Sequence, residues 1–175
     1  MTDPRIRNLA KLITGYCVDI KKGEEVVISG GIESLPLLQE IYREVLEREG
    51  YPVLVNIRDE VFDEIFYKYA SEEILTHISD IEKALVEKVP VFITILSPSH
   101  TKHLTGIDPA RISLRSKARL PLNKVFLERS ARKELKWVVA PYPTRALAQE
   151  AGMTILEYED FVYKATMVDR VDPVE

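Results

Sequence analysis

The sequence predicts an α/β fold: a single domain with an open, mostly parallel sheet of about four strands flanked by helices, in a Rossmann-like, three-layer arrangement. Short β-rich runs alternate with segments of helical periodicity, the pattern that right-handed crossovers between parallel strands produce. The run PVFITILSP at 90–98 is apolar and unbroken, as is typical of a strand buried on both faces. The 175 residues of the chain, 46% of them apolar, are enough for one domain with its own core.

The first third of the chain predicts a helix, a strand and a second helix. Asp3 can cap a helix that starts at Pro4. The apolar face of this helix consists of Ile6, Leu9, Ala10, Leu12, Ile13 and Tyr16. A β-rich strand follows at 25–29, and Gly30-Gly31 ends it. The second helix ends at Gly50 and is expected to turn the following residues inward: Leu35, Leu38, Ile41, Tyr42, Val45 and Leu46.

The middle of the chain alternates between strand and helix patterns. Ser79 and Glu82 have the spacing of a capping box, and Asp108-Pro109 signals another helix start. The expected elements are a strand at 52–57, helices in two or three pieces over 59–87, a strand at 90–98 and a long helix from 108 to about 132.

The last third predicts a strand at 135–143 and a short helix at 143–151, followed by a final helix opened by Thr154 with Glu157. Residues 1–166 are therefore expected to form the α/β domain. The helical periodicity is lost over 167–175, and this stretch is predicted to be a connector.

Charge and composition exclude several classes of function. The net charge is −4 and basic residues alternate with acidic ones, which argues against nucleic-acid binding. The start of the chain lacks the apolar run of a signal peptide, no segment approaches a membrane span, and a single cysteine fits a reducing cytoplasm. The basic residues of the long helix are interpreted as a solvated face rather than a site for an anion or another domain: Arg111, Arg115, Lys117 and Arg119.

Polar residues at the carboxyl ends of the predicted strands are candidates for a ligand site, because ligands of open parallel sheets bind there. They are Ser29-Gly30-Gly31, Asn56-Ile57-Arg58, Ser97-Pro98-Ser99-His100 and Pro141-Tyr142-Pro143-Thr144. Gly30-Gly31 could hold a phosphate on free backbone amides. The third glycine of a dinucleotide fingerprint and the Gly-Lys-Ser/Thr of a phosphate loop are both missing, so a plain strand-to-helix turn is favoured.

The histidines and the cysteine predict no reactive centre. His100 and His103 could share a helix face, but a catalytic zinc needs three protein ligands and His77 lies in a separate helical region. His100 and His103 are expected to be solvent-exposed loop residues. Cys17 has no histidine nearby in sequence and is expected to be a packed thiol rather than a nucleophile. Spacing alone therefore yields no catalytic residue and no metal ligand.

The last third of the chain resembles a known family. The pieces that carry the resemblance are Trp137, Tyr142-Pro143-Thr144, AQEAGM at 148–153 with the preceding Ala146-Leu147, and EYEDFV at 157–162. These closely resemble the amino-terminal domain of the thermophilic aminopeptidases, the aminopeptidase T and aminopeptidase S family of metallopeptidases. Weaker matches upstream extend the resemblance over essentially all of residues 1–175.

The resemblance implies a hydrolase that removes amino-terminal residues from peptides with two divalent metal ions, which activate a water and polarise the scissile carbonyl. It also implies that the metal ligands belong to a carboxyl-terminal catalytic domain outside this chain, to which 167–175 would connect. No catalytic or metal residue is therefore carried onto this sequence, and no cofactor is expected in it. The amino-terminal domain is expected to cover the metal site and to contribute to a homodimer.

Three residues are expected to face the substrate or the carboxyl-terminal domain, because they follow a strand's carboxyl end: Tyr142, Thr144 and Arg145. A scaffold role for that loop remains open. The alternative function is a stand-alone α/β interaction or small-ligand-binding module without catalysis.

Overall fold

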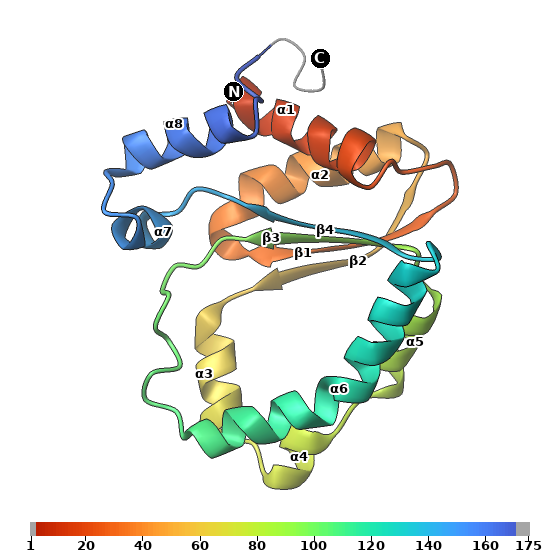
Figure 1. Cartoon of the computed structure of the whole chain (residues 1–175), viewed down its shortest axis with the longest axis vertical. Coiled ribbons are helices and arrows are strands. Elements are labelled where there is room, and N and C mark those ends of the chain that lie inside the picture. The colour runs from red at the N-terminus through yellow and green to blue at the C-terminus, as the bar shows by residue number, and fades with distance from the viewer. Residues whose placement is uncertain (1–2, 171–175) are drawn as a thin grey trace.

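The computed structural model describes residues 3–170, which form a four-stranded sheet in the order β2-β1-β3-β4 (Figure 1). All three neighbouring pairs are parallel. The strands are β1 (Glu25–Gly31), β2 (Tyr51–Arg58), β3 (Val91–Leu96) and β4 (Lys136–Pro141). The predicted α/β fold with four parallel strands is confirmed. β1 extends two residues further than predicted, because Gly30 and Gly31 pair with Ile57 and Arg58 of β2.

Helices connect the strands on both sides of the sheet (Figure 1). They are α1 (Pro4–Lys11) with the π-helical η1 (Leu12–Cys17), the 3-10 turn η2 (Ile32–Ser34), α2 (Leu35–Glu47), α3 (Glu60–Tyr69), α4 (Glu72–Thr76), α5 (Asp80–Lys88), α6 (Pro109–Ala131), α7 (Arg145–Glu150) and α8 (Ile155–Ala165). The predicted helical region before β3 is thus three separate helices, and the element order agrees with the sequence.

The local chemistry of the helix starts explains why the boundaries were predictable. The Asp3 carboxylate accepts from the Arg5 amide, and Pro4 occupies the first helical position, where an amide proton has no partner anyway. Both predicted capping boxes are present, at the starts of α5 and α8. Each satisfies two amide donors that would otherwise be left without a partner.

One face of the sheet carries the hydrophobic core. Val26 and Ile28 of β1 and Val91 and Ile93 of β3 are buried beneath α1 and α2. Val168, which follows α8, is also fully buried in this core. The predicted connector 167–175 therefore contains a packed residue at its second position, and its last five residues lie outside the described ones.

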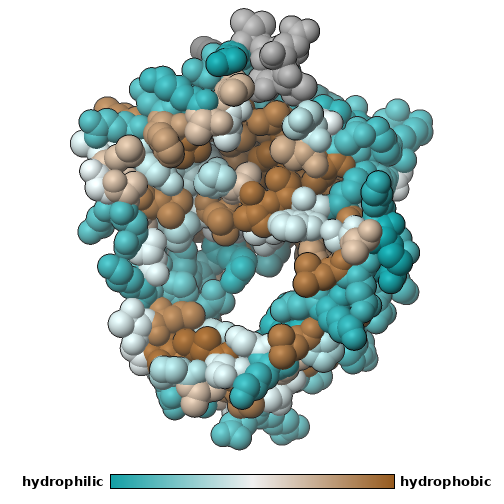
Figure 2. All heavy atoms as spheres, in the orientation of Figure 1, coloured by the Kyte–Doolittle hydropathy of each residue, from teal (hydrophilic) through white to brown (hydrophobic). Residues whose placement is uncertain are grey.

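Within residues 3–170, the opposite face of the sheet is covered only at one end. There α6 packs Phe126 against Phe92 and Trp137, and Ser130 accepts a hydrogen bond from the Trp137 indole at 3.1 Å. Beyond this contact, helices α3 to α6 stand away from the sheet and form an arch, and Figure 2 shows an opening between the two. The expectation that β3 is buried on both faces is therefore wrong for this face, where Phe92 and Thr94 are only half-buried and Leu96 is exposed.

Two predicted apolar faces are partly wrong. The π-helical winding of η1 adds a residue to the turn and rotates Tyr16 into solvent. On α2, the inward residues are Leu37, Leu38, Ile41, Glu44 and Val45. Leu35, Tyr42 and Leu46 are exposed because α2 overhangs the sheet edge at β2, where no further element among residues 3–170 covers them.

Candidate functional site

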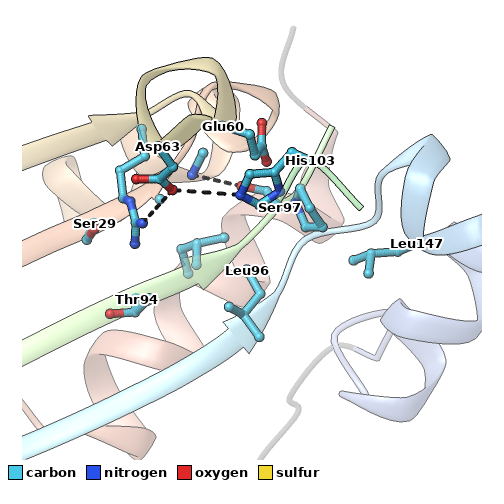
Figure 3. Close-up of a pocket in the computed structure, with 13 residues that line it drawn as sticks. Ser29, Glu60, Asp63, Thr94, Leu96, Ser97, His103 and Leu147 are labelled. Atoms are coloured by element: carbon cyan, nitrogen blue, oxygen red, sulfur yellow. Dashed lines mark hydrogen bonds and ion pairs between the residues drawn. The ribbon is translucent and has the colours of Figure 1, made fainter. Parts of the chain in front are cut away.

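A pocket of about 270 Å³ opens at the carboxyl ends of β1 and β3 (Figure 3). The chain leaves β1 towards one edge of the sheet and leaves β3 towards the other, so this is the point where the strand order reverses. Such switch points are where open α/β sheets bind ligands. The pocket is lined by Ser29, Gly30, Gly31, Arg58, Glu60, Asp63, Thr94, Ile95, Leu96, Ser97, Pro98, His103 and Leu147.

A closed ring of hydrogen bonds forms the inner wall. The Gly31 amide donates to Ser97 Oγ at 2.9 Å, Ser97 donates to Ser34 Oγ at 2.9 Å, and Ser34 donates back to the Gly31 carbonyl at 2.8 Å. A Cβ at Gly31 would lie 2.7 Å from the Ser97 carbonyl oxygen, so this close approach requires glycine. The Gly31 amide is thus occupied, and the phosphate-binding interpretation of Gly30-Gly31 loses this donor.

Charged side chains form the rim. Arg58, the last residue of β2, pairs with Asp63 of α3 at 3.1 Å, and His103 Nε2 lies 4.0 Å from the same carboxylate (Figure 3). Glu60 accepts from both the amide and the hydroxyl of Ser99, at 3.0 and 2.8 Å. Burial would raise the pKa of Glu60, but the hydrogen bonds from Ser99 and from the Glu60 amide, together with His103, outweigh it and hold that pKa below its ordinary value.

The two neighbouring histidines have different surroundings. His100 is exposed, as expected, and its Nδ1 accepts from the Lys102 amide at 2.9 Å. His103 is only partly exposed and lines the pocket, with its Nδ1 3.1 Å from the His100 carbonyl oxygen. His103 therefore lies in a loop, as expected, but is less exposed than expected, because this local contact folds the imidazole back over the rim.

The three residues expected to face another domain lie beside the pocket and do not line it. Tyr142 is half-buried against the core, and burial raises the pKa of its phenol. Thr144 is buried, and its hydroxyl accepts from the Leu147 amide at 3.2 Å to cap α7. Arg145 is exposed. Through this cap the loop fixes the start of α7, and α7 in turn presents Leu147 to the pocket.

Residues 3–170 contain no group of three or more His, Cys, Asp or Glu side chains that could hold a metal ion. The acidic residues of the pocket do not fit a pair of metal ions, because Asp63 pairs with Arg58 and Glu60 with Ser99. Cys17, predicted to be packed, is exposed because the π-helical turn ends there; its partial burial still raises the pKa of the thiol.

The sequence indicated part of this pocket and missed part. Arg58 and Ser97 were among the polar strand ends, and their convergence follows from the parallel sheet. Asp63 and His103 were missed as site residues. Asp63 lies on a helix that starts directly after β2, and the strand's final arginine is a signal that a carboxylate one turn into that helix can pair with it.

Comparisons with known proteins give one family match and one similar solved structure that agrees with the fold. The family model of the thermophilic metalloproteases, M29, matches residues 2–175. Among solved structures, wild-type AmpT from Thermus thermophilus superimposes with a TM-score of 0.70 at 19% identity, over 92% of this chain and 42% of the AmpT chain. L-tryptophan dehydrogenase from Nostoc punctiforme matches with a TM-score of 0.25 at 14% identity, over 93% of this chain and 60% of that chain.

No curated protein matches the chain. No helix in the described part of the chain is long and apolar enough to cross a membrane. The chain spans less than half of the AmpT chain, to which its fold is similar. Because the family model covers nearly every residue, the chain belongs to the M29 family of thermophilic metalloproteases.

Proposed function

We propose that this chain is the amino-terminal domain of a metal-dependent aminopeptidase that removes amino-terminal residues from peptides. The observation that carries the proposal is the match of the M29 family model over residues 2–175. The partial coverage of the AmpT chain, 42%, supports a longer parent protein. The two divalent metal ions of such an enzyme would be held by a carboxyl-terminal catalytic domain, since the described residues of this chain supply no suitable cluster.

The role proposed for this chain is to cover the catalytic domain and to contribute to a homodimer. The largely uncovered sheet face and the overhanging edge of α2 support an interaction role, because both leave apolar side chains in water. Arg145 is exposed and available to face the catalytic domain, whereas Thr144 would act by holding the loop.

The alternative is a stand-alone module that binds a small ligand without catalysis. The pocket at the switch point favours it, because that position binds ligands in many unrelated α/β proteins. The two functions make different predictions. The first requires that the full-length protein hydrolyses peptides, and the second predicts no peptide hydrolysis.

The test is an assay with leucine p-nitroanilide in the presence of cobalt, zinc or magnesium. The chain of residues 1–175 is expected to be inactive with each metal. The product of the complete reading frame, purified in the same way, is expected to hydrolyse the substrate and to lose activity with a chelator. Metal-dependent turnover by residues 1–175 alone would contradict the proposal that the metal site lies in the carboxyl-terminal domain.

A further inference from the structure

We propose that the switch-point pocket binds the free carboxylate of a peptide's last residue, with Arg58 as its anchor. This inference rests on the proposed function, because it assigns a peptide to the pocket. It adds a specificity: peptides with a free carboxyl terminus would bind, and their carboxyl-terminal amides would not.

The hydrogen bonds and ion pairs of the charged pocket residues favour an anionic ligand. Both oxygens of Glu60 accept hydrogen bonds from Ser99, and Asp63 pairs with Arg58 and faces His103. The acidic groups are thus satisfied by the protein. The side chain of Arg58 donates one hydrogen bond within residues 3–170, through Nη2 to Asp63 at 3.1 Å. Since a guanidinium carries five N–H donors in a planar fork, the remaining donors suit a carboxylate.

Two hydroxyls lie on the same face of the sheet as Arg58. Arg58 is paired with Gly31, Ser29 lies two residues before Gly31 on the same strand, and Ser29 is paired with Thr94 of β3. Alternate residues of a strand share a face, so Arg58, Ser29 and Thr94 all point to the uncovered side. Ser29 and Thr94 both line the pocket. Figure 3 shows Ser29 and Thr94 on the adjacent strands β1 and β3, close to this rim.

The remaining walls suit the apolar end of a peptide. Ile95, Leu96, Pro98 and Leu147 also line the pocket. The volume of about 270 Å³ is below the ~300–1,000 Å³ of sites that enclose a drug-sized molecule. The pocket therefore has room for the terminal residue of a peptide, and the opening between sheet and arch leaves space for the rest of the peptide.

Binding is tested by following the amide resonances of ¹⁵N-labelled residues 1–175 during titration with trialanine and with trialanine amide. Trialanine is expected to shift the resonances of Gly31, Ser97 and Ser99. The amide is expected to bind at least about tenfold more weakly, because it lacks the charge that Arg58 recognises. Arg58→Gln is expected to weaken trialanine binding by at least about tenfold. Arg132→Gln, an exposed arginine paired with Glu134, is expected to bind as the wild type does.

A second variant keeps the test independent of the Arg58–Asp63 pair. Thr94→Val preserves the shape of the side chain, removes its hydroxyl and is expected to weaken trialanine binding several-fold. Inorganic phosphate and acetate serve as further probes. Equal binding of the acid and the amide, unchanged binding by Arg58→Gln, or shifts at this pocket with phosphate but not with trialanine would each overturn the inference. Because the titration needs no metal and no turnover, its failure is separate from a failure of the peptidase assay.

Discussion

At the scale of single residues, the carboxyl group of Glu44 lies in surroundings that disfavour its charge. Glu44 of α2 is 4% exposed, and its Oε1 has no hydrogen-bond partner among residues 3–170. Burial, and then the neighbouring Glu47, raise the pKa of Glu44, although Lys11, Arg48 and Arg7 act in the opposite direction. The ionised carboxylate is therefore less stable in the folded state than in the unfolded state.

The Glu44→Gln substitution is expected to stabilise the protein at neutral pH by on the order of 1 kcal/mol, because it removes the buried charge. For an acid whose pKa is raised by folding, the loss of stability is absent below the ordinary pKa of about 4.5. It grows as the pH rises from that value and is complete above the raised pKa. The free energy of urea unfolding, measured from pH 4 to 8, should fall with pH more steeply in the wild type than in the variant. The control is Glu87→Gln, at an exposed position of α5 that does not act on Glu44; equal pH slopes for wild type and Glu44→Gln would refute the explanation.

Gly31→Ala is expected to destabilise the fold by roughly 1–3 kcal/mol, since the new methyl group would meet the Ser97 carbonyl and hydroxyl at 2.7 and 2.8 Å. Gly106→Ala is the matched control, because a Cβ there meets nothing within 4 Å. Thermal unfolding of both variants measures the difference. A Gly31→Ala protein as stable as Gly106→Ala would mean that the close approach of β1 to Ser97 can relax freely.

At the scale of elements, arginines of α6 hold the arch together through backbone carbonyls. Arg111 donates to the carbonyls of Tyr67 and Ala70 at the end of α3, and Arg115 donates to the His77 carbonyl at 2.6 Å. The interpretation of these residues as a solvated face is therefore wrong for Arg111 and Arg115. Cations at helix ends satisfy carbonyls that lack an intrahelical partner, a role that charge patterning on α6 alone cannot reveal.

Arg129 has the most buried of these guanidinium groups and donates to the carbonyls of Val86, Val89 and Glu134. Arg129→Met is expected to cost roughly 2–3 kcal/mol, because it leaves these carbonyls without their charged donor. Lys124→Met, on an exposed position of the same helix, should change stability by less than about 0.5 kcal/mol. Denaturant unfolding of the two variants compares them directly, and similar losses would argue against a structural role for Arg129.

How far the sequence reveals the structure also differs between elements. Helix starts such as Asp3-Pro4 and Ser79–Glu82 depend on contacts within one turn, so the sequence predicts them correctly. The face that α2 buries depends on where the sheet ends beneath it, which no local pattern records. The same limit applies to the site: the strand ends were predictable, but the approach of His103 to Asp63 and the hydrogen bonds of Ser99 to Glu60 join segments far apart in the sequence.

At the scale of the whole molecule, the two faces of the sheet are unequal. Val91 of β3 is 0% exposed under α1 and α2. Val139 of β4 is 45% exposed on the opposite face, which is turned towards the arch. The sequence predicted helices on both sides but not their distance from the sheet, because the length of a connection does not fix how closely it packs.

Val91→Ala is expected to cost roughly 2 kcal/mol in residues 1–175, because it removes fully buried methyl groups. Val139→Ala should cost less than about 0.5 kcal/mol, since its side chain is half in water. Calorimetric unfolding of both variants gives the comparison. Equal losses of stability would mean that the sheet face turned towards the arch is covered in solution.

The central claim is that this chain is one domain of a longer M29 peptidase. The most direct measurement is to sequence the gene beyond the codon for Glu175. The account predicts that the reading frame continues into a segment that supplies clustered Glu, His and Asp ligands for two metal ions. A stop codon directly after Glu175 would contradict it and would favour the stand-alone ligand-binding module.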